Sequence, residues 1–149
     1  MKIEDAIKVK KFRNEFERLA INISYSASLI RSRQIQLFRR YQISPEQYNV
    51  LRILRGQFPD QSNVNLIQDR MIDKMSNASR LIDKLVNKGL VERKTCSEDR
   101  RQVNVRITRM GLDLLLEIDD RVDRMNRSIF ACDESEAARI NEILNRIRS

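Results

Sequence analysis

The chain has 149 residues, of which 41% are hydrophobic and 34% are charged, and its formal net charge is +8. This length suits one domain spanning 1–149, and the composition allows a packed core beneath a charged surface. No apolar run is long enough to cross a bilayer, and the residues after Met1 do not resemble a secretion signal. We therefore expect a cytoplasmic protein whose positive charge favours a polyanionic partner.

Several residue types that active sites need are scarce or missing. Without histidine, the chain can form neither a Ser-His-Asp nor a Cys-His arrangement, and no imidazole can bind a metal. Three scattered glycines do not make a phosphate-binding loop. Carboxylate or lysine chemistry stays open on counting alone, but an enzyme is the least favoured class. We expect no catalytic residue, no metal site and no cofactor.

The two cysteines, Cys96 and Cys132, are far apart in the sequence and form no recognisable motif. A disulfide scaffold is therefore not expected. A structural or incidental role is favoured for each, and a redox role stays open.

The positive charge is unevenly distributed. Residues 74–109 hold ten Lys or Arg against four Asp or Glu, whereas the last 40 residues hold six against nine. A charge run is often only a solvated helix face, so the function must be inferred from the pattern around it.

A long helix is predicted near the N-terminus, where apolar residues recur at helical spacing. About 30 residues of helix are about 45 Å long, more than a compact domain of this size covers. Part of the apolar stripe is therefore expected to contact a second copy of the chain, and packing on the chain's own C-terminal helices is the alternative. The stripe consists of Phe12, Phe16, Leu19, Ile23, Ile30, Leu37 and Tyr41.

A second helix is predicted to begin at Ser44. Ser44 and Gln47 form a capping box around Pro45, and the helix is expected to end at Gly56. After a polar loop at 59–63, a short helix carries Val64, Leu66, Ile67 and Met71.

A third helix is expected from Ser76, its predicted cap, to Lys88. Gly89 suits the left-handed residue that ends a helix. The polar residues of this helix face away from its apolar side. The helix from Ser44, the short helix after it and this polar-faced helix together make a helix-turn-helix candidate. The inner face is Ala78, Leu81, Ile82 and Leu85.

The hydrophobic period changes to two after Gly89. Residues 90–94 and 103–107 are predicted to form two strands joined by a polar, basic loop. Thr108 is expected to cap another long helix, and Asp133 with Glu136 to form the capping box of a last one. The expected fold class is mainly α with a small two-stranded β wing: a winged helix-turn-helix flanked by long N- and C-terminal dimerisation helices.

The order of these elements suits double-stranded DNA. A helix fits the major groove, where Asn77, Ser79 and Arg80 could reach base edges or phosphates. A basic hairpin tip suits the negative potential of the minor groove. The remaining cations expected on the DNA backbone, which set affinity and its salt dependence, are Lys74, Lys84, Arg93 and Lys94.

Four segments carry a resemblance to a known family. Residues 77–93 (NASRLIDKLVNKGLVER), with Asp99-Arg100-Arg101 and the following 107–111 (ITRMG), resemble the MarR (multiple-antibiotic-resistance regulator) family of winged helix-turn-helix transcription regulators. Residues 43–51 (ISPEQYNVL) are similar to that family's second helix. One departure is that the segment 71–75 is longer than usual.

The resemblance implies a homodimeric repressor on a two-fold DNA site with half-sites about one helical turn apart. It implies a lobe at 43–108 that binds DNA and helical dimerisation regions at 1–42 and 109–149. Ser76, Asn77, Ser79 and Arg80 would begin the recognition helix.

The wing residues are assigned by the same resemblance. Arg101 would enter the minor groove and Asp99 would brace the wing, with a simple turn residue as the alternative for Asp99. For Arg100, a DNA contact and a solvated neighbour are equally favoured. Lys88 and Arg106 are expected to be solvated rather than bound to DNA.

The resemblance also implies release by a small aromatic or phenolic effector bound between the dimerisation helices and the DNA-binding lobes. The competing interpretation, from another class, is a winged-helix module that binds protein or RNA without an operator.

Overall fold

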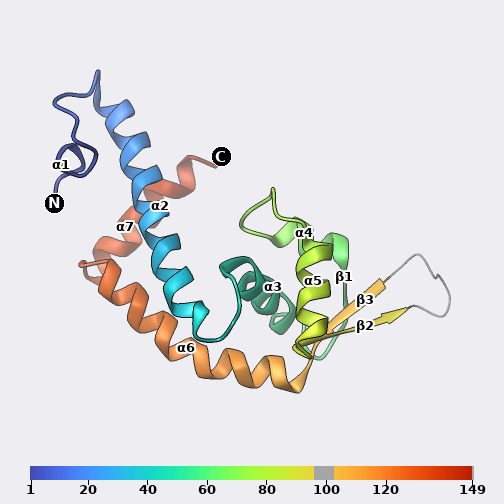
Figure 1. Ribbon diagram of the computed structural model, residues 1–149. Helices are drawn as coiled ribbons and strands as arrows, with labels where there is room; N and C mark the ends of the chain where they lie inside the picture. Colours follow the sequence, from blue (N-terminus) through green and yellow to red (C-terminus); the bar gives the residue numbers. More distant parts are fainter. Residues whose placement is uncertain (96–102, 149) are drawn as a thin grey trace. The chain divides into compact units, whose positions relative to one another are not determined.

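The computed structural model describes residues 1–95 and 103–148, in two compact units, Met1–Tyr48 and Asn49–Ser149 (Figure 1). Among these described residues, no helix is both long and apolar enough to span a membrane. Most of the described chain is helical, with one small antiparallel sheet, so the expected mainly α fold with a small β wing is confirmed.

The first unit is built on a short helix α1 (Ile3–Ile7) and a long helix α2 (Glu15–Arg39). The long helix has 25 residues and begins where the side chain of Asn14 accepts a hydrogen bond from the Glu17 N–H at 2.9 Å. Phe12 and Tyr41, which the apolar pattern included, lie outside it, so the predicted helix was too long. Local capping by Asn14 outweighed the apolar period.

Helix α3 (Pro45–Arg55) begins with the predicted capping box. The Ser44 N–H donates to Gln47 Oε1 at 2.9 Å, and the Gln47 N–H donates to Ser44 Oγ at 3.2 Å. Tyr48 stacks on Phe38 of α2 with ring centroids 4.4 Å apart. These contacts fix residues 44–48, the start of α3, against the end of α2.

Glu46, in the first turn of α3, is paired with Arg31 of α2 at 2.5 Å. Burial disfavours the charged form of Glu46, but hydrogen bonds from Arg31, the backbone and Ser44 outweigh burial and leave its pKa below its usual value.

The second unit contains the remaining helices: α4 (Val64–Arg70), α5 (Ala78–Asn87), α6 (Arg109–Ile129) and α7 (Glu134–Arg146). Thr108 caps α6 as predicted: it accepts from the Gly111 N–H at 3.2 Å and donates to the Gly89 carbonyl at 2.7 Å. Asp133 and Glu136 form the predicted capping box of α7. Hydrogen bonds from the Glu136 N–H and the Ser135 hydroxyl lower the pKa of Asp133.

The sheet has three strands, β1 (Ser62–Asn63), β2 (Val91–Thr95) and β3 (Val103–Ile107), in the order β1-β3-β2. The predicted hairpin is confirmed, with Val91 opposite Ile107 and Arg93 opposite Val105. The third strand was not predicted, because two polar residues in a loop carry no alternating pattern. It places Ser62 opposite Val105 on the free side of β3.

The core of the second unit joins the helices to the inner face of this sheet. Because α5 contributes three residues to the core, its opposite face is left in solvent. Fully or almost fully buried side chains are Val50, Leu51, Leu54, Ile67, Met71, Ala78, Ile82, Leu85, Val91, Val105, Ile107, Leu115 and Ile118.

The Ser62 hydroxyl is a weak point of this core. Ser62 is only 3% exposed, and within the described residues its Oγ has no hydrogen-bond partner. Because a buried hydroxyl without a partner costs about 1–3 kcal/mol, Ser62→Ala should raise the free energy of unfolding by about 1 kcal/mol. Urea unfolding at one fixed protein concentration measures this. Ser44→Ala, which removes a helix cap, is the control and should lower stability by about 1 kcal/mol; a loss of stability in Ser62→Ala would contradict the prediction.

Candidate nucleic-acid interface

Helix α5 presents a polar face because its apolar residues all pack inward. Ala78, Ile82 and Leu85 are at most 1% exposed, at the spacing of one helical face. Ser79 and Arg80 lie exposed on the other side. Gly89 ends this region in the left-handed conformation, φ +71°, as predicted.

The start of α5 differs from the prediction by one residue. Ser76 is not the cap; Asn77 is, and its Oδ1 accepts the Arg80 N–H at 3.0 Å. The Ser76 hydroxyl instead donates to Asp73 Oδ2 at 3.2 Å. Asn at the cap position is as favourable as Ser, so the sequence could not separate the two by propensity. The side-chain oxygen of Asn77 therefore has a structural role at the helix start.

The connection between α4 and α5 is held by the side chain of Gln68, which no sequence motif indicated. Gln68 Nε2 donates to the Lys74 carbonyl at 3.3 Å, and Gln68 Oε1 accepts the Ala78 N–H at 3.0 Å. Asn49 Oδ1 accepts the Ile72 N–H at 2.9 Å. The only signal for Gln68 was a polar residue next to the buried Ile67. These bonds fix the orientation of α5 relative to α4.

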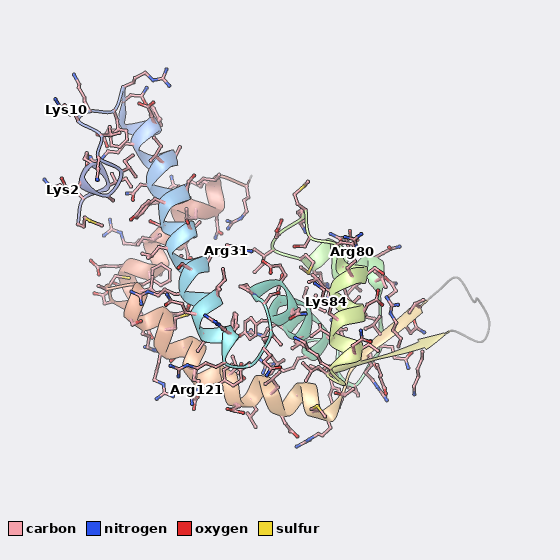
Figure 2. All side chains as sticks on the ribbon, in the orientation of Figure 1. Lys2, Lys10, Arg31, Arg80, Lys84 and Arg121 are labelled. Carbon is pink, nitrogen blue, oxygen red and sulfur yellow. The ribbon has the colours of Figure 1, made fainter. Side chains whose placement is uncertain are left out.

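Three of the predicted DNA-contacting cations are available for a ligand. Arg80 and Lys84 lie one turn apart on α5 (Figure 2), and Lys94 lies on β2. All three are exposed, and none has a hydrogen-bond or ion-pair partner among residues 1–95 and 103–148. Unpaired guanidinium and ammonium groups on one rigid helix suit phosphate oxygens and guanine edges.

Two other predicted cations have partners within the chain. Lys74 donates its ammonium to the Asp69 carbonyl. Arg93 pairs with Asp83 of α5 at 2.7 Å, and its second nitrogen donates to Ser79 Oγ at 3.2 Å. Arg93 thus ties β2 to α5 and fixes the hairpin against the helix. The sequence alone assigned Arg93 to the DNA backbone and could not reveal this contact, because the contact joins residues of different elements.

Arg106 pairs with Glu92 at 2.6 Å across the hairpin, where the strand register places the two residues opposite each other. Arg106 is therefore partly buried in an ion pair, whereas the sequence predicted a solvated side chain. The predicted wing-tip residues Asp99, Arg100 and Arg101, together with Cys96, lie outside the described residues.

Comparison with known proteins gives the same family as the sequence motifs. Residues 43–103 match the model of the MarR family. A MarR transcription factor from Planctomyces limnophilus is 26% identical, with 93% of this chain and 98% of that chain covered and a TM-score of 0.71.

Two more distant structures share the fold. They are the MepR–DNA complex of S. aureus (21% identity, 92% of this chain and 97% of that chain, TM-score 0.72) and Bordetella bronchiseptica BpsR (18%, 93% and 99%, TM-score 0.79). The BpsR structure is described as showing how 6-hydroxynicotinic acid regulates its DNA binding. With the winged-helix geometry, the match to the family model identifies residues 43–103 as a domain similar to those of the MarR family, whose members are transcription regulators and not enzymes.

Proposed function

We propose that this protein is a transcription regulator that binds double-stranded DNA sequence-specifically, with α5 in the major groove and the β2–β3 hairpin at the adjacent minor groove. The observation that carries the proposal is the exposed pair Arg80 and Lys84 on the outer face of α5. Their helix is locked in place by its core residues, by Gln68 and by the Arg93–Asp83 ion pair. Because this helix is already ordered, little conformational entropy is lost when its unpaired cations bind a polyanion.

Within this proposal the residues have different roles. Arg80 contacts guanine or phosphate, while Lys84 and Lys94 contact the phosphate backbone. Ser79 and Arg93 contact the DNA where α5 meets the β2–β3 hairpin. Ser76, Asn77 and Lys74 contact it at the start of α5. The resemblance assigns Arg101 to the minor groove, with Asp99 and Arg100 beside it.

A homodimer is part of the same proposal, with residues 43–108 as the DNA-binding lobe and 1–42 and 109–149 as dimerisation regions. Supporting it, each of the terminal helices α2 and α7 carries large apolar side chains in solvent. Phe16 is 83% exposed and Ile143 50%. Side chains of this size and exposure favour burial against a second copy. A two-fold protein would bind a two-fold site.

The regulator is further proposed to act as a repressor that a small aromatic or phenolic effector releases. The fold is shared with BpsR, whose DNA binding is regulated by an aromatic acid. Release would be a shift between two arrangements of the lobes, driven by different effector affinities for the two.

The proposal is tested by selection from a random duplex library with the full chain, followed by affinity measurement at increasing salt. Each phosphate contact releases counterions, so about six contacts should cost on the order of 10³-fold in affinity between 50 and 200 mM salt. Enrichment of one duplex family, with two chains per duplex, is expected.

The matching controls are a scrambled duplex and a duplex RNA of the same sequence. Both should bind more weakly than the selected DNA at every salt concentration. Failure to enrich any duplex, or affinity that does not respond to salt, would contradict the proposed function. Stronger binding to the RNA would favour the alternative winged-helix interaction module.

A further inference from the structure

We propose that Met75 contacts the C5-methyl group of a thymine in the major groove and so contributes sequence specificity. The inference rests on the proposed function and adds a base-reading residue to it. Met75 lies in the turn between α4 and α5, residues 72–76, which we call the apolar turn. Met75 is 92% exposed, and Ile72 of the same turn is 86% exposed.

The apolar turn is held in one conformation by hydrogen bonds. Asp73 Oδ1 accepts the Met75 N–H at 3.0 Å, and the Asp73 carbonyl accepts the Ser76 N–H at 3.2 Å. Asn49 holds the Ile72 N–H, and Gln68 holds the Lys74 carbonyl. The Met75 backbone is therefore fixed before any partner arrives, although its side chain lies in water. A contact made by such a residue needs little further ordering.

The position of the turn indicates its partner. Met75 comes two residues before Asn77, the cap of α5, and Figure 1 shows the turn at the N-terminal end of that helix, while β2 begins near the other end. In helix-turn-helix proteins, the N-terminal residues of the recognition helix are the ones that contact base edges. Arg80 is an exposed cation in the first turn of α5, at the same end of the helix as the turn (Figure 2). Its positive charge favours a polyanion at this end.

The chemistry narrows the contact to one group. Among the base edges of the major groove, the thymine C5-methyl is the apolar one, and the others offer hydrogen-bond donors and acceptors. A methionine thioether is flexible and polarisable, so it can adapt to a methyl group without satisfying any donor. Burying one methyl group is worth about a fourfold change in affinity.

The test replaces thymine by deoxyuridine, which lacks only this methyl group, one position at a time in the duplex selected by the full wild-type chain. At one thymine the replacement should weaken wild-type binding about fourfold. Met75→Ala removes the contact from both chains of the proposed dimer, so it should bind the unmodified duplex about 16-fold more weakly, and it should not respond to deoxyuridine at that position or at its two-fold mate.

Ile72→Ala is the matched control, since it shortens the other exposed apolar side chain of the same turn. It should keep the wild-type response to deoxyuridine. Met75 lies in solvent, so Met75→Ala should also keep the wild-type melting temperature. If no thymine replacement affects the wild type, or if Met75→Ala responds as the wild type does, the inference is overturned while the proposed function stands. If selection enriches no duplex, the proposed function itself fails.

Discussion

Gly111→Ala is expected to lower the free energy of unfolding by about 3 kcal/mol, the upper end of the range for overpacking a core. A Cβ atom at this position would lie 2.4 Å from the Leu90 carbonyl oxygen and 2.7 Å from Ile107 Cγ1. The Leu90 carbonyl cannot move aside freely, because it accepts the Thr108 N–H at 3.1 Å. Gly111 therefore permits α6 to start directly against the end of α5 and the base of the hairpin.

The measurement is urea unfolding of the purified variant beside Gly56→Ala. A Cβ on Gly56 would lie 3.4 Å from the Ile53 carbonyl, which is ordinary contact, so this control should change stability by less than about 1 kcal/mol. An equal effect of the two substitutions would show that α6 does not approach Leu90 as closely as described.

Local chemistry explains which elements could be predicted from the sequence. The capping boxes at Ser44 and Asp133 and the left-handed Gly89 depend on residues within a few positions of each other. The hairpin followed from strict alternation at 103–107. Such signals are complete within a short window of sequence, and the structure confirms them.

Contacts between distant residues explain what the sequence could not show. Strand β1 exists because Ser62 pairs with Val105 far along the chain, and nothing in its two residues indicates a strand. The length of α2 was overestimated because an apolar repeat continues past Asn14, where the helix begins. The cap of α5 was predicted at Ser76 instead of Asn77, because serine and asparagine are equally good capping residues.

The sequence indicated which cations of the candidate site are exposed, but not the contacts that hold the site together. Sequence identified Arg80, Lys84 and Lys94, which are exposed as expected. It could not identify Gln68 as the clamp of the helix-turn-helix, nor the pairing of Arg93 with Asp83, since both depend on how α5 packs. The exposure of Met75 also became visible only with the turn in three dimensions.

Arg80→Ala is expected to weaken binding of the selected duplex about 10- to 100-fold, since a good arginine contact to a base is worth about 1–3 kcal/mol. Arg80 is exposed, its guanidinium has no partner within the described residues, and its own N–H is held by the Asn77 cap. Loss of its side chain should leave the helix intact. A changed base preference in a repeated selection would show that Arg80 reads a base, whereas a uniform loss would assign it to phosphate.

Binding of DNA by the outer face of α5 can be tested by comparing Arg80→Ala with Arg121→Ala in one titration of the selected duplex. Arg121 on α6 is also exposed and, within the described chain, also has no partner, so the two variants lose the same charge at different places (Figure 2). We predict a 10- to 100-fold loss for Arg80→Ala and less than about a threefold loss for Arg121→Ala, as expected for a change in net charge alone. Equal losses in the two variants, or none in Arg80→Ala, would show that the outer face of α5 is not the DNA-binding surface.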